Sequence, residues 1–287
     1  MNRNIRRNIA LHTALIGLLG LLLSATIEAA PSTASVLKLD RETLTPQGIS
    51  VLELNNRVGS IVFQGSPSRT LRIHAIIKPQ DHSGVYFFGL FSCCSEHHRQ
   101  VIQGATLVIK REHAHTLDIS LNLPHDRSLK HVKVDWSIEV PEDLGLLLRN
   151  HVGLIRIHDV TGTIQAHNNV GSIKVSGARA KVALRVNVGT ISISGARHSV
   201  SAHTNVGSIH VLSDTTSIHR IALDTNVGSL HLSGMPAGQG SGSTSTSIPV
   251  GGTYRYTGTG RDSIRLKTNI GAIDLSFSHA SGKHRHT

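Results

Sequence analysis

The chain has 287 residues, of which 39% are hydrophobic and only 16% charged, a balance that excludes wholesale disorder. Aromatic residues make up 3%, which argues against a nucleic-acid or sugar site built from stacked rings, and the two adjacent cysteines cannot form a disulfide framework. Lysine and arginine outnumber aspartate and glutamate by 29 to 18, a formal net charge of +11.

Residues 1–29 have the order of a secretory signal peptide. A basic head with three arginines precedes an apolar run at residues 14–25, and the small residues Ala29 and Ala30 follow. The run is shorter than the ~20 residues that a spanning helix needs, which disfavours an uncleaved anchor. We therefore expect cleavage after Ala29, no transmembrane segment in the mature protein, and a periplasmic, extracellular or cell-surface location.

Residues 30–143 predict an N-terminal antiparallel β region that caps a repeat domain. Apolar and polar residues alternate in runs such as 71–76, 117–121 and 132–138, which is typical of strands joined by hairpins. The segment 51–64 contains one early copy of the repeat unit described below. Repeat domains need capped ends, and this region is the natural N-terminal cap.

An insertion at residues 85–98 combines an aromatic run with the densest cluster of cysteine and histidine. The aromatic run predicts a strand under the cap or, alternatively, an exposed contact for a partner or membrane surface. Adjacent cysteines rarely both ligate one tetrahedral ion, so we predict no metal and no cofactor. A disulfide, vicinal or between chains, is the favoured interpretation, and a loop without a role is the other. The weak metal candidates are Cys93, Cys94, His97 and His98.

An internal repeat organises residues 144–277. Its motif is an aliphatic residue, Gly, usually a small residue, Ile or Leu, any residue and an apolar residue. From Gly153 onward the glycine recurs at intervals of 18, 18, 18, 21 and 43 residues. Apolar and polar residues alternate on both sides, which indicates strands with one buried face. The predicted turn residues are Gly59, Gly153, Gly171, Gly189, Gly207, Gly228 and Gly271, with Asn169, Asn187, Asn205, Asn226 and Asn269 two positions before the glycine.

Units this short bury their apolar faces only by stacking on one another. We therefore predict an all-β fold, a parallel β-solenoid (β-helix) of 18-residue coils stacked in sequence order. A Gly/Ser-rich loop at 235–262 would precede the last coil, and a basic tail would follow at 278–287. The asparagines would form a hydrogen-bonded ladder along the stack, and exposed Asn-Gly turns without a ladder are the alternative.

The repeated Asn-x-Gly-x-Ile-x-Val units, the early unit at 56–63 and the strand entry at 136–148 are similar to the bacterial DUF4097 family. This family is related to DUF2807, and its members are often labelled "putative adhesin". The resemblance covers about residues 48–277. It implies a β-helical envelope or surface protein and supplies no catalytic residues. The chain departs from many members in having Val or Ile, not Asn, before the glycine.

No catalytic signature is visible in the sequence. The nucleophile elbow, the P-loop and the H-E-x-x-H motif are absent, and the outward residues Asp224 and Asp274 have no partner carboxylate. The scattered histidines are expected to be solvated. We therefore predict that the protein is not an enzyme but an exported, adhesin-like binding or scaffold module of the bacterial cell envelope. A carbohydrate-active β-helix enzyme and a purely structural envelope protein are the alternatives.

The positive charge predicts attraction to anionic envelope lipids or polysaccharides, or to another protein. Nucleic acid is disfavoured because the chain is expected to be exported. The alternative is that the charge serves solubility alone.

Overall fold

The computed structural model describes residues 36–45, 47–79, 104–123, 132–235, 246–248 and 251–278. The predicted signal peptide, the 85–98 insertion with its cysteines and the tail beyond residue 278 lie outside the described residues, so the statements about them remain predictions. The chain divides into units 1–34 and 35–287, and every described residue belongs to the second. No helix that could span a membrane occurs in the described ranges.

Strands make up all the regular secondary structure of the described ranges, which confirms the all-β prediction. They are β1 (Leu37–Leu44), β2 (Val51–Val58), β3 (Ile61–Ser66), β4 (Thr70–Pro79), β5 (Thr106–His113), β6 (Thr116–Asn122), β7 (Val132–Pro141), β8 (Gly145–His158), β9 (Ile164–Ser176), β10 (Val182–Ala196), β11 (Val200–Val206), β12 (Ile209–Ser213), β13 (Ile218–Val227), β14 (Leu230–Ser233), β15 (Thr246–Ile248), β16 (Gly252–Thr257), β17 (Asp262–Ile270) and β18 (Ile273–Phe277).

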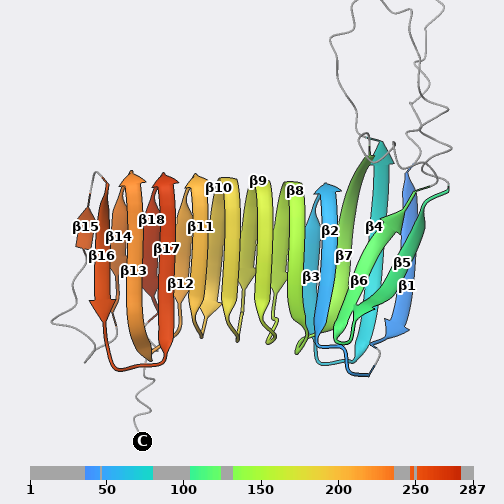
Figure 1. Cartoon of the computed structure of the whole chain (residues 1–287), viewed down its shortest axis with the longest axis horizontal. Helices are drawn as coiled ribbons and strands as arrows, with labels where there is room; N and C mark the ends of the chain where they lie inside the picture. Colours follow the sequence, from blue (N-terminus) through green and yellow to red (C-terminus); the bar gives the residue numbers. More distant parts are fainter. Residues whose placement is uncertain are drawn as a thin grey trace, which may run out of the picture. The chain divides into compact units, whose positions relative to one another are not determined.

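Each repeat folds into two strand segments that meet at the Asn-x-Gly corner. In β9, Ile164 and Ala166 of the first segment and Ile173 and Val175 of the second are buried, following the alternation of apolar residues. The first segments form one layer and the second segments form another (Figure 1). Their buried side chains form the hydrophobic core. β8, β9 and β10 pass through the corner, so all strands belong to one continuous mixed sheet.

The repeats pair in parallel and in register. Gly171 of β9 lies opposite Gly153 of β8 and Gly189 of β10, so residues 18 positions apart are neighbours across the strands. β11 and β12 continue the two layers beyond β10. The early unit joins the same stack, because β2 and β3 both pair in parallel with β8 (Figure 1).

The N-terminal region differs from the predicted antiparallel cap. Antiparallel pairs do join β1 to β4, β4 to β7 and β5 to β6. However, β6 pairs in parallel with β2, and β7 pairs in parallel with β3. The region is therefore a mixed extension of the stack, because the early unit presents the same parallel edges as the other repeats.

The last repeat does not stack at the end of the series, which corrects the expected sequence order. β17 pairs with β11 on one side and with β13 on the other, and β18 lies in the same way between β12 and β14. The repeat at residues 262–277 is thus inserted between two repeats that precede it in the sequence.

Loop length and edge coverage explain this insertion. The interval from Gly207 to Gly228 is 21 residues, three more than the preceding interval of 18. Three extended residues reach ~10 Å, enough for β13 to leave room for one more strand at ~4.8 Å. The outer edges of β13 and β14 are taken by the antiparallel strands β16 and β15. The inner edges remain for the last repeat.

Asp262, at the start of the inserted repeat, ties it to both neighbours. Its carboxylate accepts hydrogen bonds from Ser199, which precedes β11, over 3.4 Å and from Thr215, which precedes β13, over 2.9 Å. Both hydroxyls therefore hold the first residue of β17, and Asp262 itself is almost fully buried.

The corner of each coil excludes a side chain at the glycine. Gly189 has a φ of +140° and Gly207 a φ of +135°, which residues with a Cβ rarely adopt. A Cβ on Gly189 would also lie 1.7 Å from the carbonyl oxygen of Gly171 in the neighbouring coil. Glycine is therefore required both by backbone conformation and by the close approach of the coils.

A buried polar column runs along the stack three residues before the corner glycines. Asn168 donates to the carbonyl of Gly153 over 2.8 Å, and Thr268 donates to that of Gly207 over 3.2 Å. Asn150, Thr204 and Thr225 make the equivalent bond in their coils. These side chains lie at inward positions and satisfy backbone carbonyls that would otherwise face the core. Val186 holds the same position in β10 and has no hydroxyl or amide to donate.

Candidate functional site

A row of basic side chains, in which arginine or lysine alternates with histidine, crosses the outer surface of the first layer. It lies four residues before the corner glycines, where the side chains alternate outward from the buried positions. In-register pairing places these residues next to one another on successive strands. We call this row the basic column, and its members in stack order are Arg149, His167, Arg185, His203 and Lys267.

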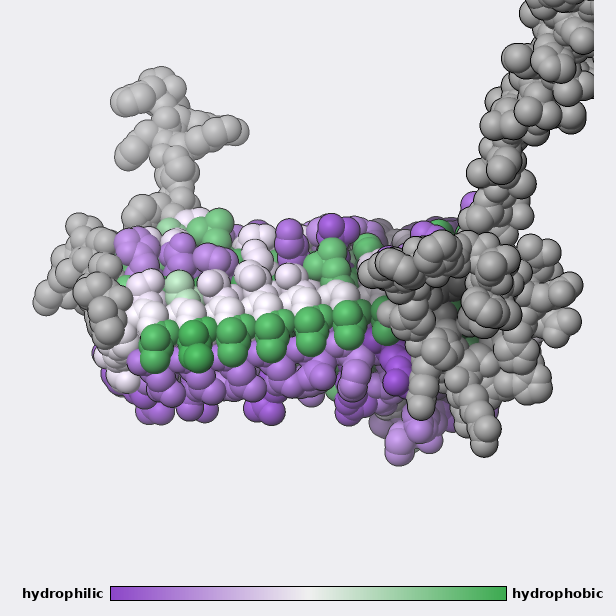
Figure 2. All heavy atoms as spheres, turned by 90° about the horizontal axis from the view of Figure 1, so that it is seen from above, coloured by the Kyte–Doolittle hydropathy of each residue, from purple (hydrophilic) through white to green (hydrophobic). Residues whose placement is uncertain are grey.

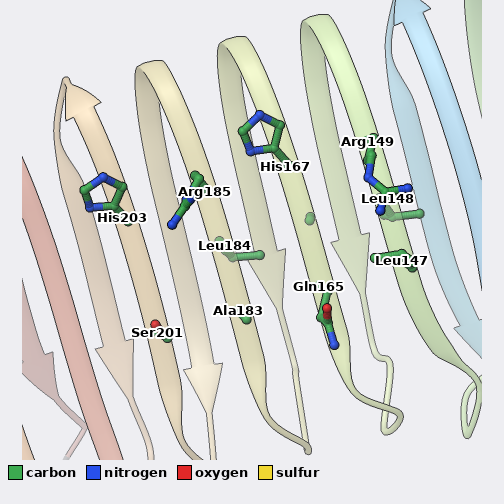
Figure 3. Close-up of a pocket in the computed structure, with 11 residues that line it drawn as sticks. Leu147, Leu148, Arg149, Gln165, His167, Ala183, Leu184, Arg185, Ser201 and His203 are labelled. Carbon is green, nitrogen blue, oxygen red and sulfur yellow. The ribbon is translucent and has the colours of Figure 1, made fainter.

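Small and neutral residues lie beside the basic column and form the floor of a groove. Figure 3 shows Gln165, Ala183 and Ser201 below the cationic side chains on the same strands. A cavity of about 290 Å³ lies between these two rows. A second cavity of about 500 Å³ shares these three residues and extends toward Lys181 and Arg220. The groove is therefore bordered by basic side chains on both sides of a floor that is uncharged on β9, β10 and β11, while Arg265 continues the floor row on β17.

Carboxylates neutralise the basic face mainly at its two ends. Glu53 of β2 pairs with Arg149 at 2.5 Å, and Asp224 of β13 pairs with Arg255 of β16 at 3.0 Å. Between these ends, no carboxylate of the described ranges forms an ion pair with Arg185. The middle of the column thus presents uncompensated positive charge to solvent.

The pKa of His167 reflects this environment. Partial burial lowers the pKa of His167 below its ordinary value, and the positive charges of Arg185 and Arg149, together with His151, lower it further. A lowered pKa keeps the free imidazole neutral at pH 7 and able to donate one hydrogen bond. An anion bound between the arginines would offset their repulsion.

The groove is suited to electrostatic binding. Its arginine and lysine side chains donate hydrogen bonds to anionic oxygens, and its amide and hydroxyl groups bind neutral polar groups. Among the described residues, no group of three or more His, Cys, Asp or Glu could hold a metal ion. The two outward aspartates noted in the sequence do not meet, since Asp224 pairs with Arg255 and Asp274 lies 3.9 Å from His210 on β12.

The residues predicted at the turns are brought into columns along the stack. The seven glycines follow one another from coil to coil, each contacting the backbone of the next. The Asn187 amide donates to Asn169, that of Asn205 to Asn187 and that of Asn269 to Asn205, the last two over 3.4 Å. A hydrogen-bonded ladder therefore crosses four coils.

The basic column was not anticipated from the sequence, in which the histidines were interpreted as scattered and solvated. His167 and His203 instead alternate with Arg149, Arg185 and Lys267. The signal available was the interval of 18 residues that separates Arg149, His167, Arg185 and His203, the same interval as the glycines. Lys267 holds the equivalent position four residues before Gly271, but its place beside His203 depends on the inserted repeat.

No protein-family model matches the chain, so the resemblance to DUF4097 stays a prediction. No curated protein matches it either. Among solved structures, the chain is similar to a "putative cell adhesion protein" from Clostridium sporogenes, with a TM-score of 0.44 and 14% sequence identity. The match covers 84% of this chain and 100% of that chain.

Proposed function

We propose that the protein is an exported, non-catalytic β-solenoid of the cell envelope that binds acidic polysaccharide through the basic column. The observation that carries this proposal is the alignment of Arg149, His167, Arg185, His203 and Lys267 on adjacent strands. In-register stacking converts basic residues that recur along the sequence into a continuous row, with a permanent positive charge on every second strand. The adhesin-like or scaffold role and the export belong to this proposal.

The dimensions of the column favour an extended ligand. Five side chains at the strand spacing of ~4.8 Å cover ~19 Å, longer than a single small anion. An exposed ion pair contributes only about 0.2–1 kcal/mol, so one contact would not hold a ligand. A polymer with repeated carboxylates engages several cations at once and gains affinity from each, which favours it over a monomeric anion.

The test measures binding of polygalacturonate, with neutral dextran as the reference polymer. The protein used lacks only residues 1–29, which precede every described residue. Binding to polygalacturonate should weaken as salt rises, since exposed charges are screened over ~10 Å at 0.1 M. Dextran should not bind.

A matched pair of double variants locates the site. Arg185→Ala with Lys267→Ala removes two charges from the basic column, and Arg156→Ala with Lys174→Ala removes two charges from exposed positions of the second layer. The first pair should lower affinity about tenfold, which corresponds to ~1.4 kcal/mol, and the second should change it little. Equal losses from both pairs would refute the assignment of the column, and binding that is insensitive to salt would refute the electrostatic basis.

A further inference from the structure

A continuous row of exposed aliphatic side chains runs along the corner of the stack, separate from the basic groove. It occupies the position directly before each corner glycine, and successive members are paired across the strands. Figure 2 shows it as an unbroken green row. We call it the aliphatic ridge, and it consists of Val152, Val170, Val188, Val206, Ile270 and Val227 in stack order.

The ridge is exposed although the corner does not require apolar residues there. Its members have between 42% and 58% of their surface accessible. The positive φ lies on the glycine that follows, so the corner geometry places no demand for an aliphatic side chain on Val188 or its equivalents. A threonine at these positions would have the same β-branched shape, and its hydroxyl would form hydrogen bonds with water. The largest contiguous apolar patch on a protein surface is often a contact site.

The flanks of the ridge are uncharged over five consecutive coils. On one side lie the asparagines of the ladder, from Asn169 to Asn226. On the other side lie the corner glycines, followed by Ser172, Thr190, Ser208, Ala272 and Ser229. At the first member of the ridge, Val152, His151 stands in the place of the asparagine. A neutral band thus surrounds the ridge on a chain of net charge +11.

We propose that the aliphatic ridge is a self-association surface whose occupant is the ridge of a second copy of this chain. The ridge repeats at the strand spacing of ~4.8 Å, and a second copy presents apolar side chains at the same spacing, so that the two rows interdigitate. A two-fold arrangement uses the same patch on both copies. Because two positively charged copies repel each other, the neutral band is where they approach at least cost. The ridge residues carry no cation that could bind an acidic polymer.

The area of the ridge sets the expected strength of association. Six side chains at ~4.8 Å and a band four residues wide at ~3.3 Å per residue cover about 400 Å² on each copy. The total of about 800 Å² is below that of a standard stable interface of ~1,600 Å². The structure therefore points to a weak dimer that forms as concentration rises, as it would where many copies are held on one surface.

Sedimentation velocity tests this proposal over a hundredfold range of protein concentration. This range is about what separates a largely monomeric from a largely dimeric population. The protein again lacks only residues 1–29. Val188→Lys places a charge at the centre of the ridge, and in a two-fold dimer it brings two charges together. Ser192→Lys is the matched control, because it adds the same charge to the same strand at the column where Lys174 already lies one coil away. Val188→Thr keeps the shape of the side chain and removes only its apolar surface.

The parent should shift from monomer toward dimer, Val188→Lys should weaken association about tenfold or more, and Ser192→Lys should behave as the parent. Val188→Thr should fall between, which keeps the test decisive if the lysine variant fails to fold. A parent that stays monomeric throughout, or equal weakening by Val188→Lys and Ser192→Lys, would overturn the proposal. Binding of a monomer to neutral phosphatidylcholine vesicles through Val188 would assign the ridge to a membrane instead and overturn it too.

Discussion

Replacing Gly189 with alanine should destabilise the fold far more than replacing Gly195, although both glycines lie in β10 and both have positive φ. The φ angles are +140° at Gly189 and +71° at Gly195, so each alanine would be strained. The two positions differ in their surroundings. A Cβ at position 189 would lie 1.7 Å from the carbonyl oxygen of Gly171, whereas one at position 195 has its nearest atom, Oδ2 of Asp214, at 3.6 Å.

The magnitude follows from these two contributions. A non-glycine residue in a sparsely populated backbone region costs about 1–3 kcal/mol at either position. At position 189 the Cβ and the carbonyl oxygen must also separate from 1.7 Å to at least 3.0 Å. That displacement pulls β10 away from β9 and weakens two or three hydrogen bonds, worth about 0.5–1.5 kcal/mol each. Gly189→Ala should therefore cost about 2–7 kcal/mol and Gly195→Ala about 1–3 kcal/mol, and the difference of about 1–4 kcal/mol comes from the hydrogen bonds weakened at position 189.

Urea denaturation measures both variants, followed by far-UV circular dichroism and by the fluorescence of Trp136, the single tryptophan of the chain. Trp136 is buried next to the early repeat, so its emission reports the integrity of the stack. Thermal melts should show Gly189→Ala lower by about 10 °C or more, given ~2–4 °C per kcal/mol for a domain of this size. Equal losses of stability in the two variants would mean that the coils do not approach each other in this register.

Three further predictions concern polar groups of the fold. Val186→Thr should leave the free energy of unfolding unchanged or raise it, because its hydroxyl can donate to the carbonyl of Gly171, as Thr204 does to that of Gly189. Val182→Thr, in the apolar core of the same strand, is the control and should cost about 1–2 kcal/mol in urea unfolding. Burial alone would raise the pKa of Asp135, but hydrogen bonds from Ser60 and the charges of Lys133 and Lys78 outweigh it and hold the pKa below its ordinary value. The ionised Asp135 should therefore contribute its full stabilisation above the ordinary pKa of ~3.9 and lose it as pH falls through the lowered pKa. In a plot of the free energy of unfolding against pH, Asp135→Asn should flatten this part of the curve. Asp262→Ala should speed amide hydrogen exchange in β17 more than in β9, because it removes the hydrogen bonds from Ser199 and Thr215 that hold the inserted repeat. An equal acceleration of exchange in the two strands would contradict this account.

The strands and the corners of the repeats could be predicted from sequence because both depend on local chemistry. Alternation of apolar and polar residues from Val182 to Val186 marks a strand with one buried face, and glycine at position 189 marks a conformation that other residues avoid. The interval of 18 residues then identifies which residues are equivalent. The same alternation, however, would place Val188 inside with Val186, and only the turn at the corner directs Val188 to solvent.

The order of the stack was decided by tertiary structure. Each repeat offers the same parallel edges, so the edge of β11 could accept β13 or β17, and local sequence does not distinguish them. The outcome depends on β16 covering the far edge of β13 and on a longer connection that lets β13 stand one strand further away. Surface chemistry follows from that order, because Lys267 extends the basic column and Ile270 completes the aliphatic ridge only when the last repeat lies inside the stack.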